Sequence, residues 1–146
     1  MTDAADPLAL IRLINDTSAF NRWCGIEVDN ADAGSVQISM AWRADLGQYA
    51  GFLHAGLIGT LIDTACGFAA ATVVGRVLAS HYSVNCLRPG VGERFVARAR
   101  VVKPGRTQVF TACDLFAITN GQEKLIANGA TLLTVVAEQP PRIGGP

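Results

Sequence analysis

The stretch from Leu57 to Val74 is almost entirely apolar or small, and its one charged residue, Asp63, lies near its centre. A run of this length could span a membrane, but an aspartate in the middle of a span is costly in hydrocarbon. We therefore expect a helix from about His54 to Val74, ended by Gly75, that is buried inside a soluble protein.

Strand-like patterns surround this helix. Before it, Val36 to Trp42 alternates apolar and polar residues. Four further strands are predicted after it, at residues 78–87, 94–102, 107–118 and 125–136, with a hairpin turn at Asn120-Gly121. Because hairpins join antiparallel strands and an apolar helix must be enclosed, we predict an α+β fold in which a curved antiparallel sheet wraps around one long helix.

The ends of the chain are less regular. Asp6-Pro7 predicts the start of a short amphipathic helix that ends near Asn15, and Phe20 to Val28 is interpreted as a first short strand. The length of 146 residues suggests a single domain, which we place at residues 1–136. Residues 137–146, with three prolines and two glycines, are expected to form a flexible tail.

Composition excludes several functions. Twelve basic residues balance twelve acidic ones, which argues against binding to nucleic acid through a basic surface. The four cysteines form no close pair, and two histidines are too few for a structural zinc site. Because residues 1–6 carry acids and no secretory signal, we expect a cytoplasmic protein with free thiols and no membrane association. No dinucleotide-binding, phosphate-loop or serine-elbow motif is present.

Asp63 is the first candidate functional residue. On a helical wheel it shares one stripe with small residues, namely Gly56, Thr60, Gly67, Ala70 and Ala71. Small side chains let a ligand or another protein surface approach, and a poorly solvated carboxylate must find partners or shift its pKa. Asp63 is therefore either a functional acid or a structural residue of a subunit interface.

The start of the helix supplies the second candidate. The first amides of a helix lack internal partners, so those of Ala55 or Gly56 could stabilise an oxyanion next to His54, although the same residues suit an ordinary helix start. Gln48 lies in the preceding loop. His81 and Ser83 share one face of a strand, which faces either solvent or a pocket across a dimer.

These residues carry a resemblance to a known family. The run Gly51–Gly56, followed after six residues by Asp63-Thr64-Ala65, resembles the signature of hotdog-fold acyl-CoA thioesterases of the phenylacetate-pathway (PaaI-like) type. Residues 85–89 and 101–107 resemble a strand end and a hairpin of the same family. The similarity covers roughly residues 20 to 136, and it implies a hotdog fold without a cofactor.

The resemblance also implies a role for each candidate. Asp63 would attack the thioester or activate water, and the amide of Ala55 would form the oxyanion hole. His54 would help to place the thioester, and Gln48 would orient water or substrate. Sites in this family lie at dimer interfaces, which makes His81 and Ser83 candidate substrate contacts across subunits.

Two residues depart from the pattern of the family: Ala55 replaces the usual glycine, and Gln48 is combined with an aspartate, whereas subfamilies with glutamine often carry glutamate on the helix. Our hypothesis is that a homodimer, or a tetramer formed from two dimers, hydrolyses a small or medium acyl- or aroyl-CoA. The alternatives are a non-catalytic protein that binds acyl-CoA and, third, a hydratase or dehydratase on the same scaffold.

Overall fold

The computed structural model describes residues 5–137 as three helices, one short 3-10 turn and six strands. The helices are α1 (Pro7–Asp16), α2 (Ala19–Cys24) and α3 (Ala55–Val74), with the 3-10 turn η1 at Ala44–Leu46. The strands are β1 (Glu27–Asp32), β2 (Ser35–Ala41), β3 (Val77–Cys86), β4 (Arg94–Lys103), β5 (Gln108–Thr119) and β6 (Gln122–Val135). The tail predicted at 137–146 lies outside the described residues, apart from Ala137.

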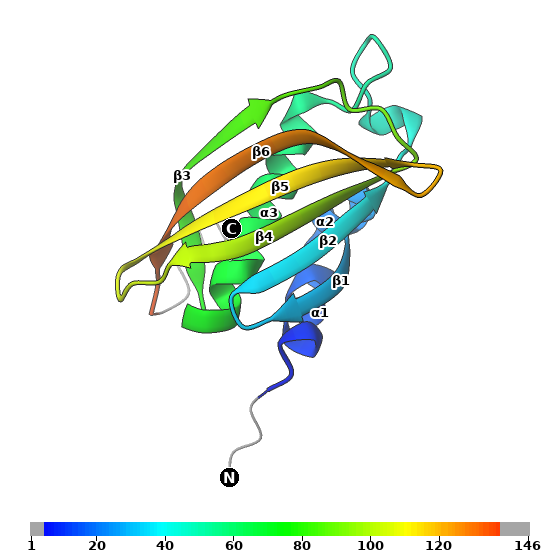
Figure 1. The fold of residues 1–146 in the computed structure, drawn as a ribbon. Helices are drawn as coiled ribbons and strands as arrows, with labels where there is room; N and C mark the ends of the chain where they lie inside the picture. The colour runs from blue at the N-terminus through cyan, green and yellow to red at the C-terminus, as the bar shows by residue number, and fades with distance from the viewer. Residues whose placement is uncertain (1–4, 138–146) are drawn as a thin grey trace, which may run out of the picture.

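The six strands form one antiparallel sheet in the order β1-β2-β4-β5-β6-β3, which curves around α3 (Figure 1). This confirms the predicted α+β architecture and the arrangement that a hotdog fold implies. The Asn120-Gly121 turn joins β5 to β6 with positive φ angles of 51° and 75°, as a tight hairpin turn requires. β1 and β3 are the edge strands of the sheet.

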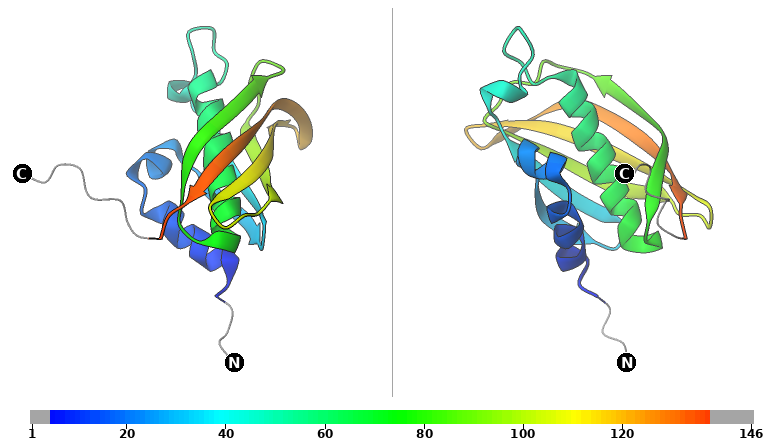
Figure 2. Two further views of the ribbon diagram at one scale, coloured as in Figure 1. Left: turned by 90° about the vertical axis from the view of Figure 1, so that its left-hand side faces the viewer. Right: turned by 180° about the vertical axis from the view of Figure 1, so that it is seen from behind.

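The core lies between the concave face of the sheet and one side of α3 (Figure 2). Leu61, Ile62 and Ala65 of α3 are fully buried, and Phe95 and Leu115 are fully buried on the strands that face them. Within residues 5–137, α3 is also the one helix that is long and apolar enough to cross a membrane. Since it packs against the sheet, its apolar character is explained by burial in the core, as predicted.

The N-terminal region corrects one prediction. α1 begins after its predicted cap, Asp6, but the short first strand expected within Phe20–Val28 is largely wrong, because α2 occupies residues 20–24 and β1 includes only the last two residues of the range. Ser18 caps α2 by accepting a hydrogen bond from the amide of Asn21, and Gly25 ends it in a left-handed conformation at φ 77°. The first strand therefore begins only at Glu27.

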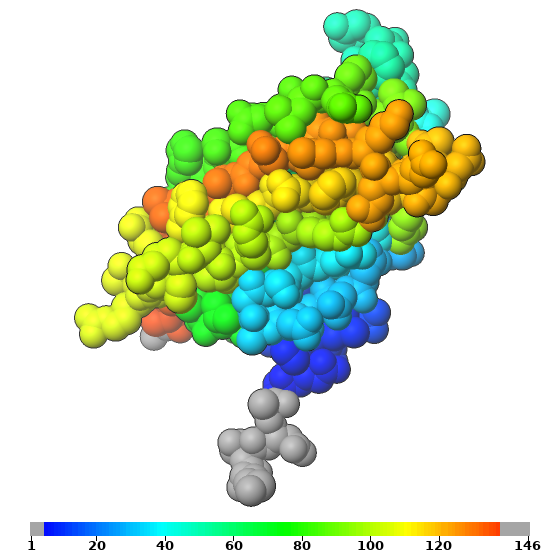
Figure 3. Space-filling view, viewed as in Figure 1, coloured from blue at the N-terminus to red at the C-terminus, as the bar shows by residue number. Residues whose placement is uncertain are grey.

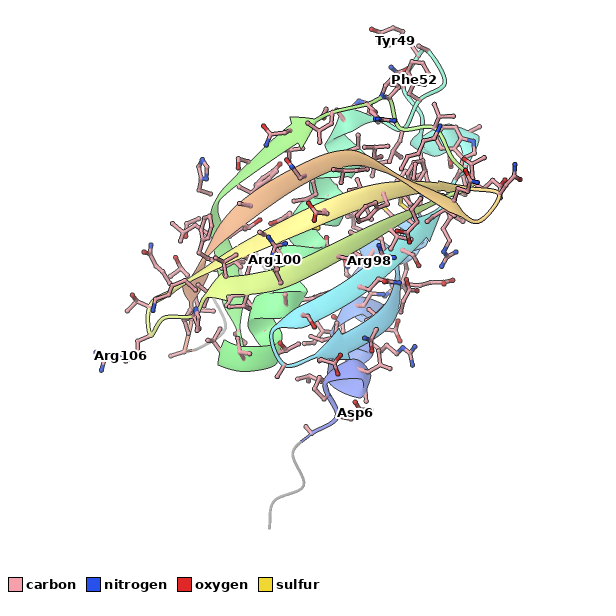
Figure 4. The ribbon with its side chains drawn as sticks, viewed as in Figure 1. Asp6, Tyr49, Phe52, Arg98, Arg100 and Arg106 are labelled. Atoms are coloured by element: carbon pink, nitrogen blue, oxygen red, sulfur yellow. The ribbon has the colours of Figure 1, made fainter. Side chains whose placement is uncertain are left out.

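The three helices lie on the concave side of the sheet, so the opposite face is formed by strands alone (Figures 2 and 3). Arg98 and Arg100 of β4 project from this convex face (Figure 4). Arg98 forms an ion pair with Glu123 and also donates to the side chain of Gln37 at 2.9 Å. The arginines of β4 therefore lie on the far side of the sheet from α3.

Candidate functional site

The loop before α3 holds the start of the helix in place. The amide of His54 donates to the carbonyl of Leu46 at 3.1 Å, and the amide of Leu53 donates to the carbonyl of Gly90 at 2.9 Å. Between these anchors the chain forms a turn that projects from the molecule, with Tyr49 and Phe52 near its tip (Figure 4). Both ends of the loop are thus tied to the body of the protein, which fixes the position of the first helical amides.

His54 is the cap of α3. Its Nδ1 accepts a hydrogen bond from the amide of Gly56 at 2.8 Å. An imidazole nitrogen that accepts carries no proton, so the neutral ring has its proton on Nε2, which remains a donor. The Gly56 amide is thus engaged by His54. The amide of Ala55 has no recorded acceptor within residues 5–137 and belongs to an exposed residue. Of the two amides considered for an oxyanion hole, that of Ala55 is free to bind a ligand.

The cap predicts a stability difference between two variants of His54. His54→Ala removes the acceptor for the Gly56 amide and should lower the free energy of unfolding by about 1 kcal/mol. His54→Asn replaces the imidazole with a good capping side chain and should retain most of that stability while removing the Nε2 donor. Urea unfolding followed by circular dichroism measures both, and equal losses in the two variants would contradict the capping role.

Gln48 lies in the same loop as the helix start. Its side-chain Oε1 accepts a hydrogen bond from the backbone amide of Ala50, and its backbone amide donates to the carbonyl of Phe52 at 2.8 Å. The side-chain oxygen is therefore used to shape the turn, while the side-chain NH2 group has no recorded acceptor within residues 5–137. The structure brings Gln48, His54 and Ala55 to one end of α3.

Asp63 lies two turns further along α3, at an intermediate position between the buried and the exposed side of the helix. It is partly buried, and within residues 5–137 its carboxylate has no hydrogen-bond donor within 3.5 Å and no cation within 4 Å. Burial without a partner raises the pKa of Asp63 above its ordinary value of 3.8, because desolvation penalises the charged form. An unpaired carboxylate of this kind is available to act as a base or a nucleophile.

The predicted stripe of small residues is confirmed with one correction. Gly56, Thr60 and Gly67 lie with Asp63 on the part of α3 that the sheet does not cover, whereas Ala70 is fully buried. Ala70 packs with Val109 and Leu133 in a small second core cluster. A wheel drawn for an isolated helix could not reveal this, because the curved end of the sheet wraps further around the last turns of α3.

A groove of about 690 Å³ lies beside Asp63. It is bounded by α1, by the uncovered side of α3 and by the start of β3, and its lining is mostly apolar. Its volume is within the range of pockets that bind small organic ligands. The groove reaches from Asp63 to the turn at Gly75 and Arg76. An acid therefore lies at one end of an apolar groove.

β3 contributes a residue that the sequence interpretation missed. Tyr82 faces α3, where a side chain added at Gly59 would meet its ring at 3.4 Å. Gly59 precedes Asp63 by one helical turn, so the half-exposed phenol lies on the same side of the helix as the acid. The alternation of Tyr82 with Val84 and Cys86, an apolar set, was the available signal for this inward face.

His81 and Ser83 lie on the opposite face of β3. Adjacent strand residues point to opposite sides, and Tyr82 between them faces the helix. Their partners in β6 are Leu132 and Ala130. The structure therefore does not bring His81 and Ser83 together with Asp63 in one chain, and their role in substrate binding stays a prediction that depends on a second copy.

The acid and the free amide are far apart within one chain. Asp63 follows Ala55 by eight residues on the same helix, which corresponds to about 12 Å along the helix axis. A thioester carbonyl that accepts a hydrogen bond from Ala55 cannot at the same time be attacked by Asp63 of the same chain. Within residues 5–137, no group of three or more histidine, cysteine or acidic side chains gathers as a metal site.

Comparisons with known proteins agree with this fold. Residues 50–124 match the family model described as the thioesterase superfamily. The "Putative esterase" of Halobacterium salinarum is 32% identical over an alignment of 113 residues that covers 72% of this chain and 74% of that protein. A thioesterase family protein from Silicibacter pomeroyi has a TM-score of 0.83 at 36% identity, covering 85% of this chain and 93% of that one. The E. coli PaaI protein from the phenylacetic acid degradation operon has a TM-score of 0.79 at 22% identity, covering 89% and 96% of the two chains, which is a likeness of fold.

Proposed function

Because the chain belongs to the thioesterase superfamily, we propose that it hydrolyses the thioester bond of an acyl-CoA to a free acid and coenzyme A. Membership supports a hydrolase of thioesters or esters. The observation that carries the proposal is the carboxylate of Asp63, which has no hydrogen-bond or ion-pair partner among residues 5–137, is partly buried and is adjacent to an apolar groove. A protein that only bound acyl-CoA would not need an acid in that position.

The proposed active site is built from two copies of the chain. β3 is ten residues long and lies at the edge of the sheet. Among residues 5–137 it pairs with β6 alone, which leaves its outer edge able to pair with a second copy. Two copies related by a two-fold axis across this edge have antiparallel α3 helices. Asp63 of one copy then lies toward the start of α3 in the other copy. The two groups therefore do not need to bridge the distance of about 12 Å that separates Asp63 from Ala55 within one chain.

The start of α3 would bind the carbonyl group of the substrate. The amide of Ala55 donates to the carbonyl oxygen, and the Nε2 proton of His54 supplies a second donor for the thioester or for its leaving group. The positive end of the helix dipole stabilises the negative charge that develops on this oxygen. The methyl group of Ala55 leaves this amide donor in place, because it changes only the side chain.

Asp63 of the other copy would drive the cleavage. Its carboxylate either attacks the carbonyl carbon directly or takes a proton from a water molecule that attacks it. In both routes the tetrahedral intermediate collapses with loss of the thiolate of coenzyme A, which then takes up a proton. After direct attack the acyl group is left on Asp63 as a mixed anhydride, which water hydrolyses to the free acid and the restored carboxylate. The NH2 group of Gln48 would hold the water or the substrate, because the side-chain oxygen is engaged by the loop.

The proposal predicts a pH dependence that follows from burial of Asp63. Both routes need the ionised carboxylate, and burial raises the pKa of Asp63, so kcat/KM should rise with pH through a midpoint above 3.8. Rates of thiol release from octanoyl-CoA between pH 3.5 and 8 measure this rise of kcat/KM. A rate that is constant over the acidic range would contradict the role of the carboxylate.

The proposal itself is tested by thiol release from a panel of aliphatic and aromatic CoA esters. We expect hydrolysis of at least one acyl-CoA well above the background rate in buffer. Binding of all esters without release of thiol would instead favour a non-catalytic acyl-CoA-binding protein.

A further inference from the structure

We propose that Gly67 keeps the groove beside α3 open for an extended apolar acyl chain, which makes Gly67 a specificity-determining residue. The proposal rests on the function proposed above and names the class of acyl group that the same site prefers. Three observations carry it: the shape of the groove, the character of its walls and the surroundings of Gly67.

The groove is elongated along the helix. Its lining includes Asp63, Gly67, Ala71 and Gly75, which follow one another at intervals of four residues. At a rise of 1.5 Å per residue, this row of four residues extends about 18 Å along the axis of α3. An acyl chain that starts at a thioester next to Asp63 would therefore run along the helix toward Gly75. This shape suits an extended chain better than a short acyl group such as acetyl.

The walls of the groove are mostly apolar, although Asn21, Thr64 and Arg76 also line it, and several of the large apolar side chains are partly exposed. Leu10 and Ile14 of α1 are 40% and 39% exposed, and Leu78 of β3 is 49% exposed, yet all three line the groove. Large apolar side chains that remain accessible inside a concave site indicate an apolar ligand. α1 lies next to α3 on the concave side of the sheet (Figure 2), and its residues Leu10 and Ile14 form one wall of the groove.

Gly67 lies in the middle of this path. Glycine is less favourable than alanine inside a helix, and Gly67 does not have a positive φ angle that would require glycine. A side chain added at Gly67 meets nothing within 4 Å, whereas one added at Gly59 meets Tyr82. Crowding within one copy of the chain therefore does not explain the glycine at position 67. The space above it is the groove, which a larger side chain would fill.

The test compares acyl chain lengths in matched variants. Gly67→Leu places a bulky side chain in the groove at a helical position where leucine is favourable. Val73→Leu is the control, because Val73 is on the same helix and 43% exposed but does not line the groove. For the wild type, kcat/KM should be at least about tenfold higher for octanoyl-CoA than for acetyl-CoA, since each buried CH2 group adds affinity.

We expect Gly67→Leu to lower kcat/KM for octanoyl-CoA about tenfold more than for acetyl-CoA, which brings the ratio close to one, and we expect Val73→Leu to keep the wild-type ratio. A wild-type ratio retained by Gly67→Leu, or equal losses on both substrates, would overturn the proposal. If the wild type releases no thiol from any ester, the proposed hydrolase function fails. In that case the affinities for octanoyl-CoA and acetyl-CoA, measured by calorimetry, test the groove proposal independently of hydrolysis. Equal affinity of Gly67→Leu and the wild type for octanoyl-CoA would reject it.

Discussion

Replacing Asp63 with asparagine is expected to lower kcat for acyl-CoA hydrolysis by about a thousandfold, which is the order of effect of removing a catalytic base. The amide is nearly the same size as the carboxylate, but it neither accepts a proton from water nor attacks a thioester. Thiol release measured with octanoyl-CoA gives the effect. Activity within a few-fold of the wild type would end the proposed mechanism.

The Asp63→Asn variant is also expected to change the stability of the protein in a direction that shows whether it folds normally. The folded protein binds the Asp63 proton more tightly than the unfolded chain does, because burial raises the pKa of this group. Ionised Asp63 therefore destabilises the folded state, and stability is lost as pH rises through the raised pKa. Asp63→Asn removes that cost and should raise Tm at pH 7. The gain should shrink as pH falls toward 3.8, the ordinary value for aspartate.

Thermal unfolding at pH 4 and pH 7 distinguishes the two interpretations of Asp63, as a functional acid or as a structural residue. A residue that served only to stabilise the fold or an interface would give a lower Tm when replaced. Loss of activity together with a higher Tm is the signature of a functional group held at a cost in stability.

Local patterns predict much of the fold. α3 and the last four strands follow from apolar periodicity and from turn residues such as Asn120-Gly121, all of which act over a few residues. α2 was missed although Ser18 and Gly25 are ordinary start and stop signals for a helix. Its six residues carry too short a pattern to distinguish a helix from a strand.

The candidate site was only partly predictable. Asp63 and the start of α3 could be identified because both are features of a single segment. The hydrogen bond from the Gly56 amide to His54 depends on a side-chain rotamer, which no pattern encodes. Tyr82 came to face the helix through the pairing of β3 with β6, which includes an irregularity between Ala79 and His81. The groove is formed by residues from several elements, among them Leu10 and Ile14 of α1, and no local pattern predicts how these elements pack together.

The second large effect concerns the amide of Ala55. Ala55→Pro removes the N–H group that is proposed to bind the oxyanion, and it should lower kcat by about 100-fold to 1000-fold. Proline is well tolerated at the first position of a helix, and His54 before it already has an extended conformation with ψ 134°. Ala55→Gly keeps the amide and should retain activity, so it is the matched control.

The central claim is that Asp63 and Ala55 act together only across two copies of the chain. Co-expression of Ala55→Pro and Asp63→Asn chains with different affinity tags, followed by purification through both tags, isolates the mixed dimer. That dimer has one site with both groups intact and one with both replaced, so we predict about half of the wild-type activity, although each variant alone is nearly inactive. Mixed dimers as inactive as the parent variants, or chains that do not purify together, would contradict the claim.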